Sequence, residues 1–137
     1  MTAKAFVDTN VFVYAVAYDD PDKAARARAL LNQIMKARSG VVSSQVMVEF
    51  ASTLVNKFGE PAAKVRPLMD MFDRFKVVSA TKAHVLSALD IHVRSKVNYW
   101  DALIVAAAMS ANCSTLYTED MSHGQTVVSI KIVNPFA

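Results

Sequence analysis

Ala5-Phe6-Val7-Asp8-Thr9-Asn10 opens the chain with a short apolar run that ends at a carboxylate and a turn-forming pair. The apolar residues Ala5 to Val7 predict a short buried strand, because such runs are typical of strands covered on both faces. Four more runs of this kind follow and are predicted as strands: Val41-Val42, Val77-Val78, Leu116-Tyr117 and Ile130 to Val133. The recurrence of short apolar strands favours a parallel sheet.

Amphipathic helices are predicted between these strands, from apolar residues at helical spacing and from cap residues at their starts. The predicted helices are Val11 to Ala17, Pro21 to about Arg38, one capped by Ser43 or Ser44 and ending at Gly59, Pro61 to about Phe75, one capped by Thr81 and reaching about Ser95, and one capped by Asn98 that runs from Tyr99 to Ala111. Strands alternating with helices predict an α/β fold, a three-layer α/β/α domain with a central parallel sheet that spans residues 1–137 as one domain.

The composition narrows the class of protein. The chain has 137 residues, of which 53% are apolar and 20% charged, a balance typical of an ordered globular domain. Its single cysteine, Cys113, allows no disulfide within the chain, and its longest apolar run, Ala102 to Met109, is too short to cross a bilayer. We therefore expect a cytoplasmic protein without membrane contact. The net charge of +3 permits a polyanionic partner but does not require one.

The acidic residues stand at the places where a sheet of this kind binds ligands, beyond the carboxyl ends of its strands. Asp8 directly follows the first strand, and Glu49 lies one turn into the helix after the second. Asp101 is in the first turn of the helix capped by Asn98, and the pair Glu119-Asp120 follows the Leu116-Tyr117 strand. Four acids that are distant in sequence are therefore expected to meet in one pocket.

Such a cluster is unfavourable by itself, because neighbouring carboxylates repel and burial raises their pKa values. A bound divalent cation reverses this balance, and an all-oxygen ligand set suits Mg²⁺ or Mn²⁺ better than zinc. A cation held in this way can lower the pKa of a water and neutralise a phosphate. The cluster thus indicates metal-assisted hydrolysis of a phosphodiester.

Each acid also has a purely structural interpretation, which the residues alone leave open. Asp8 could start a turn, and Asp101 lies at capping-box spacing from Asn98. Glu49 could be an exposed helix residue, and Glu119-Asp120 an ordinary loop pair. Glu49 and Asp101, however, lie inside otherwise apolar stretches, where a solvated acid is less expected.

Four segments resemble, in order and approximate spacing, the pattern of the PIN-domain ribonucleases. They are Phe6-Val7-Asp8-Thr9-Asn10, Val46-Met47-Val48-Glu49-Phe50, Tyr99-Trp100-Asp101-Ala102-Leu103-Ile104-Val105-Ala106-Ala107-Ala108 and Leu116-Tyr117-Thr118-Glu119-Asp120-Met121. The third segment is the most specific of the four, and the resemblance extends from Ala5 to Pro135. It implies a three-layer PIN-like domain.

The resemblance also implies a site. Its catalytic and metal-binding residues would be Asp8, Glu49, Asp101 and Asp120, with Mg²⁺ or Mn²⁺ as the cofactor. The fourth acid of the family usually follows its threonine at the second place, which selects Asp120 over the adjacent Glu119. Substrate-binding or supporting roles would fall to Asn10, Thr118 and Glu119.

Small single-domain members of this family are typically VapC-type toxins of VapBC toxin–antitoxin pairs. The resemblance therefore implies an endoribonuclease that acts on RNA, a cognate antitoxin as protein partner, and a homodimer. The apolar residues Met69, Met71, Phe72 and Phe75 crowd one short helix, where core packing and contact with a partner chain are both open.

Two other functions stay open. One is a catalytically silent PIN-like module that only binds RNA. The other is a phosphatase with Asp8 as nucleophile, against which Asn10 counts, because such phosphatases usually carry a second aspartate there.

Overall fold

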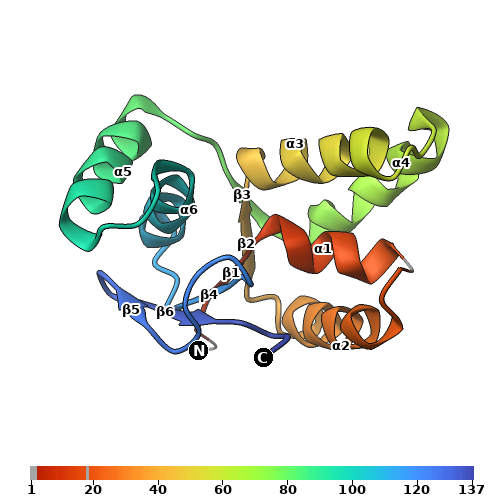
Figure 1. The fold of residues 1–137 in the computed structure, drawn as a ribbon, viewed down its shortest axis with the longest axis horizontal. Helices are drawn as coiled ribbons and strands as arrows, with labels where there is room; N and C mark the ends of the chain where they lie inside the picture. Colours follow the sequence, from red (N-terminus) through yellow and green to blue (C-terminus); the bar gives the residue numbers. More distant parts are fainter. Residues whose placement is uncertain (1–2, 18) are drawn as a thin grey trace.

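The computed structural model describes residues 3–17 and 19–137, whose strands form one six-stranded sheet in the order β3-β2-β1-β4-β6-β5 (Figure 1). The strands are β1 (Ala5–Val7), β2 (Gly40–Ser43), β3 (Lys76–Val78), β4 (Thr115–Tyr117), β5 (Thr126–Val127) and β6 (Ile130–Val133). All neighbouring pairs are parallel except β5 with β6, which is antiparallel. The predicted parallel sheet is therefore confirmed, with one short antiparallel strand added at its edge.

Helices cover both faces of the sheet. They are α1 (Thr9–Val16), α2 (Pro21–Ala37), α3 (Ser44–Ser52), α4 (Ala62–Leu68), α5 (Lys82–Ser95) and α6 (Tyr99–Ser110). The helices α5 and α6 lie on one side of the strands, and α1 to α4 lie on the other, which gives the expected three layers (Figure 1). Across the described part of the chain, no helix is both long and apolar enough to span a membrane.

Two of the predicted helices change type before they end. The helix α3 continues as a π-helical segment, η1 (Thr53–Lys57), and α4 continues as a 3₁₀ segment, η2 (Met69–Arg74). Pro67 lies inside α4, where it lacks the N–H group that an α-helical hydrogen bond needs. The sequence pattern gave the extent of both helices but not these changes, because apolar spacing hardly distinguishes neighbouring helix types.

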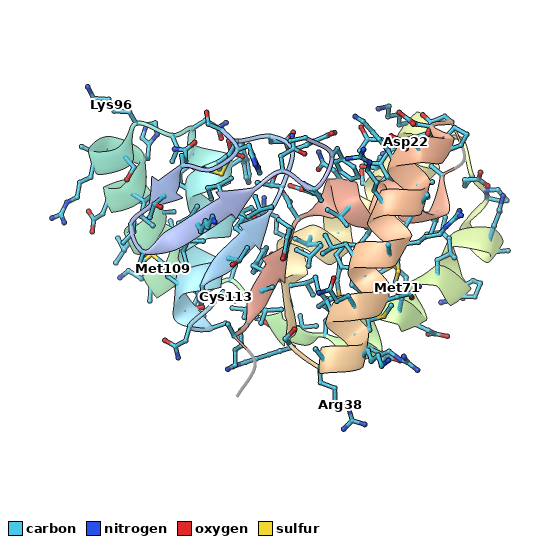
Figure 2. The ribbon with its side chains drawn as sticks, turned by 90° about the horizontal axis from the view of Figure 1, so that it is seen from below. Asp22, Arg38, Met71, Lys96, Met109 and Cys113 are labelled. Atoms are coloured by element: carbon cyan, nitrogen blue, oxygen red, sulfur yellow. The ribbon has the colours of Figure 1, made fainter. Side chains whose placement is uncertain are left out.

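The predicted cap residues start their helices as expected. Ser43, rather than Ser44, caps α3 by accepting a hydrogen bond from the backbone N–H of Val46. Thr81 caps α5 and Asn98 caps α6 in the same way. At the other ends, Arg38 after α2 and Lys96 after α5 adopt left-handed backbone conformations, and their side chains point away from the molecule (Figure 2).

The core between the sheet and the α1–α4 layer is built on aromatic rings. The ring of Phe12 lies 4.8 Å from that of Phe72 and 5.2 Å from that of Phe75, measured between centroids. Gly40 admits this packing, because a Cβ at that position would overlap the Phe75 ring. Phe72 and Phe75 are therefore buried core residues, and Met69 and Met71 pack against the same core.

Core packing thus accounts for Phe72 and Phe75, whereas Met69 and Met71 are half-buried, and a partner contact there stays a prediction. The large exposed apolar residues instead include four on α5: Val85, Leu86, Leu89 and Val93. This helix lies at the outer edge of the molecule (Figure 1).

The strand β5 was absent from the sequence prediction. It pairs with β6 across the two residues Val128 and Ser129, and Val128 has a positive φ of 56°. Hairpin turns of this length usually carry glycine or asparagine, which tolerate positive φ. Because Val128 occupies this position, the sequence carries no signal that predicts the turn.

Candidate functional site

The sheet order reverses between β1 and β4, which run parallel side by side. Ligand sites of open α/β sheets lie at such a reversal, beyond the carboxyl ends of the strands. Asp8 directly follows β1, and its backbone N–H donates to the carbonyl of Tyr117, the last residue of β4, at 3.0 Å. The segment that carries Thr118, Glu119 and Asp120 therefore begins beside Asp8.

Asp8 is nearly enclosed, with only 6% of its surface exposed. Its Oδ1 accepts a 2.7 Å hydrogen bond from the N–H of Thr9, and its Oδ2 accepts one of 2.9 Å from the hydroxyl of Thr118. The pKa of Asp8 is raised to about 6, mainly by burial and also by the charges of Asp120 and Glu49, while the two hydrogen bonds oppose the rise. Asp8 is thus a buried carboxylate that lies within the field of two others.

Glu49 is tied to the same centre through Thr9. The hydroxyl of Thr9 donates to Glu49 Oε2 at 3.1 Å, while its backbone N–H binds Asp8. The side-chain amide of Gln45, one turn earlier on α3, donates to Glu49 Oε1 at 2.9 Å. Sequence reasoning missed Thr9 and Gln45. The spacing of Gln45 and Glu49 is a readable helical signal, but the link from Thr9 to Glu49 joins two elements and has none.

Asp101 is held by Asn98 at the start of α6. Asn98 accepts a 2.9 Å hydrogen bond from the N–H of Asp101 and donates one of 2.8 Å to its Oδ2. The Asn98 cap is therefore confirmed, although the Asp101 carboxylate bonds the side-chain amide of Asn98 and not its backbone N–H as in a capping box. Burial raises the pKa of Asp101, the charges of Asp120 and Glu49 add to the rise, and the bond from Asn98 opposes it. Asp101 therefore serves the helix and also faces the other acids.

The last two acids differ in their surroundings. Asp120 is exposed, its backbone N–H donates to the hydroxyl of Thr118 at 3.1 Å, and its Oδ1 accepts from the amide of Asn10 at 3.2 Å. Asn10 also donates to Glu119 Oε1 at 3.3 Å, so it joins the two acids. The charge of Asp120 acts on both Asp8 and Asp101.

Glu119 is turned toward a second set of partners, which the sequence did not reveal. The hydroxyl of Tyr14 donates to its Oε1 at 2.7 Å, and the ammonium of Lys23 donates to its Oε2 at 3.1 Å. Burial acts to raise the pKa of Glu119, but the hydrogen bonds from Tyr14, Lys23 and Asn10 together lower it. Because Tyr14 lies on α1 and Lys23 on α2, no local pattern could have linked them to Glu119.

The structure thus gathers the acids without packing them tightly. Hydrogen bonds through Thr9 and Thr118 join Asp8, Glu49 and Asp120. Asp101 is linked to this group by the charges of Asp120 and Glu49, which raise its pKa. Within residues 3–17 and 19–137, no three acidic, histidine or cysteine side chains form a ready-made metal-binding group. The donor chemistry still fits a hard divalent cation, because the site offers carboxylate oxygens whose mutual repulsion a cation would relieve.

Solved structures with the same fold include three from toxin–antitoxin systems. A toxin–antitoxin complex from Klebsiella pneumoniae is 16% identical, with a TM-score of 0.68 over 96% of this chain and 98% of that one. A DNA-bound VapBC from Salmonella typhimurium is 17% identical, with a TM-score of 0.69 over 96% and 97%. A sarcin-ricin-loop-cleaving VapC toxin from Mycobacterium tuberculosis is 18% identical, with a TM-score of 0.66 over 85% and 92%.

At these identities the likeness shows the shared fold. No curated protein matches the sequence. The family model of the PIN domain matches residues 5–126, which include every acid of the site and the strands that carry them. The chain belongs to the PIN domain family.

Proposed function

We propose that this protein is a metal-dependent endoribonuclease and the toxin of a toxin–antitoxin pair. The observation that carries the proposal is the gathering of carboxylates around the buried Asp8, which Thr9 links to Glu49 and Thr118 links to Asp120. Asp8 also caps α1, but a cap does not require other carboxylates whose charges raise its pKa, so the arrangement favours a functional role. Membership of the PIN domain family and a neighbour described as an RNA-cleaving toxin support this reading.

Asp8, Glu49, Asp101 and Asp120 are the residues that would hold Mg²⁺ or Mn²⁺. Such a cation supplies positive charge to a phosphodiester and lowers the pKa of water. The protein positions the acids for this: Thr118 orients Asp8, and Thr9 links Asp8 to Glu49. Because the four acids would hold the cation, the nucleophile would be a water molecule. No side chain then needs to form a covalent intermediate.

Two protein partners belong to the proposal. One is a cognate antitoxin, which the similarity to toxin–antitoxin complexes supports. The other is a second copy of this chain. On α5, Val85, Leu89 and Val93 recur every fourth residue with exposed fractions of 37%, 46% and 73%. This spacing forms one apolar stripe on a helix, which a second copy would cover.

The test compares wild-type protein with Asp8→Asn on total cellular RNA in the presence of Mg²⁺. The matched control is Asp22→Asn, which changes the same group on the exposed face of α2, where Asp22 only pairs with Arg26. We expect the wild type and the control to cut RNA at the same sites and Asp8→Asn to cut none. Equal cleavage by Asp8→Asn would overturn the mechanism. RNA binding without cleavage by the wild type would instead identify a silent RNA-binding module.

A further inference from the structure

A pocket of about 280 Å³ lies directly beside the carboxylates. Thr9 and Asn10, which contact Glu49 and Asp120, form part of its wall. Thr53, Lys57 and Phe58 form another part, and none of these three belongs to the acidic site. The pocket therefore continues the acidic site toward the far end of α3.

The wall formed by Thr53, Lys57 and Phe58 is shaped by the π-helical segment η1. Its hydrogen bond runs from the N–H of Phe58 to the carbonyl of Thr53, five residues back, at 3.2 Å. Such wide turns are rare and occur frequently at functional sites. Here the turn brings both of its ends, Thr53 and Phe58, onto the pocket.

The pocket wall has the mixed chemistry that an unpaired nucleotide requires. Phe58 offers a half-buried aromatic ring, and the ammonium of Lys57 lies 5.6 Å from the centre of that ring. Among the described residues that line the pocket, Lys57 is the single lysine or arginine. Asn10 and Thr53 add uncharged polar groups. Single-stranded nucleic acids are held in this way, by aromatic rings against bases and cations against phosphates.

Two carboxylates, Asp19 and Glu119, also line the pocket and would repel a phosphate. The charge of Glu119 is offset by Lys23 at 3.1 Å, and its oxygens already accept from Tyr14, Lys23 and Asn10. Carboxylate oxygens can also accept hydrogen bonds from the amino groups of bases. A base toward the acids, with its phosphate toward Lys57, is the orientation that agrees with these charges.

We propose that this pocket binds one unpaired nucleotide of the RNA substrate, next to the phosphate that is cut, with its base against Phe58 and a phosphate near Lys57. This inference rests on the proposed ribonuclease function. The volume lies just below the range of about 300–1,000 Å³ typical of drug-sized ligands, so it suits one nucleotide rather than a duplex. Only an unstacked base can enter, which makes single-stranded RNA the substrate class.

The kinetic test measures kcat and KM for cleavage of a single-stranded RNA by Lys57→Met and Phe58→Leu. The matched control is Lys82→Met, at the start of α5 and away from the pocket. Stacking on an aromatic ring contributes enough that Phe58→Leu is expected to raise KM about tenfold. We expect Lys57→Met also to raise KM, kcat to stay close to wild type in both, and the control to change neither value. Because Lys57 is exposed, its variant is expected to keep the wild-type melting temperature.

A binding measurement separates this inference from the proposed function. The probe is a fluorescent single-stranded RNA about ten nucleotides long, followed by anisotropy without divalent metal so that no cleavage occurs. Weaker binding by both variants supports the pocket, even if the wild type proves unable to cut RNA.

Unchanged KM and unchanged Kd in both variants would overturn the proposed nucleotide pocket and leave the proposed nuclease function in place. A wild type that neither binds nor cuts the RNA would overturn both. Weaker binding of an antitoxin with unchanged KM and Kd for RNA would assign the pocket to the protein partner and overturn this inference.

Discussion

The hydroxyl of Thr118 donates a 2.9 Å hydrogen bond to Oδ2 of Asp8 and accepts a 3.1 Å hydrogen bond from the backbone N–H of Asp120. One side chain thereby joins the acid that follows β1 to the loop that follows β4, across the reversal of the sheet order. Thr118 itself is 1% exposed, so neither of its partners can readily exchange it for water.

We predict that Thr118→Val destabilises the protein by about 1–3 kcal/mol, because it removes the hydroxyl bonded to Oδ2 of the buried Asp8 and to the backbone N–H of Asp120. Thr118→Ser keeps the hydroxyl and is expected to recover most of this loss. Urea unfolding of both variants at neutral pH gives the free energies. Equal stabilities of the valine and serine variants would show that the hydroxyl contributes nothing to holding Asp8.

The raised pKa of Asp8 predicts a pH dependence of stability. Because the folded protein binds the Asp8 proton more tightly than the unfolded chain does, Asp8 stabilises the fold least when it is ionised in both states. As pH rises from about 3 to about 7, through both pKa values, the free energy of unfolding of chelated wild type should fall by about 3 kcal/mol relative to that of Asp8→Asn. Parallel stability curves for the two proteins would contradict the shift.

Replacing the carboxylate by an amide is expected to affect RNA cleavage differently at Glu119 and at Asp120. Asp120→Asn removes a charge that acts on Asp8 and Asp101, so it should abolish RNA cleavage. Glu119 is already bound by Tyr14, Lys23 and Asn10, so Glu119→Gln should retain cleavage within about tenfold. Initial rates at saturating Mg²⁺ provide the comparison. Loss of cleavage in Glu119→Gln with retention in Asp120→Asn would reverse the assignment of the fourth acid.

Most of the fold could be predicted from the sequence, because its signals are local. Buried strands such as Ala5–Val7 are short apolar runs, and caps such as Asn98 stand at the starts of apolar helices. The hairpin of β5 and β6 was not predicted, because Val128 adopts a backbone conformation that is usual for glycine and asparagine. The π-helical turn after Ser52 escaped because it lies within an uninterrupted helical pattern.

The acids of the candidate site were predicted from the sequence, and Asn10 and Thr118, which the family resemblance implied as supporting residues, contact them. Asp8 and Asp120 follow strands, and the sheet rule places such residues together. The contacts of Thr9 and Lys23 could not be predicted, because Thr9 bonds Glu49 forty residues away and Lys23 bonds Glu119 from another helix. Such contacts depend on how α1 and α2 pack, which no spacing within one segment encodes. Met69 and Met71, for which the sequence left core packing and a partner contact open, are half-buried and pack against the core.

Metal binding is expected to raise the melting temperature of the wild type. Mg²⁺ or Mn²⁺ at about 100 times its Kd stabilises a protein that binds it only when folded by about 3 kcal/mol. Asp8→Asn should show a much smaller shift, and Asp22→Asn, on the exposed face of α2, should show the full one. Differential scanning fluorimetry of chelated and metal-loaded samples measures this. Identical melting temperatures in the wild type at millimolar metal would count against a metal site.

The α5 stripe predicts a homodimer that one charge would separate. Leu89 lies in the middle of the stripe between Val85 and Val93 and is 46% exposed, so a glutamate there would still be solvated in the monomer. In a dimer the same glutamate would be buried against apolar side chains, at a cost of several kcal/mol without a partner. Leu89→Glu should therefore sediment as a monomer at concentrations where the wild type sediments as a dimer.

The control is Val55→Glu, which adds the same charge at a valine outside the stripe whose exposed fraction is similar, 43%. This variant should remain dimeric. A wild type that sediments as a monomer, or a Leu89→Glu protein that remains a dimer, would exclude α5 as the contact.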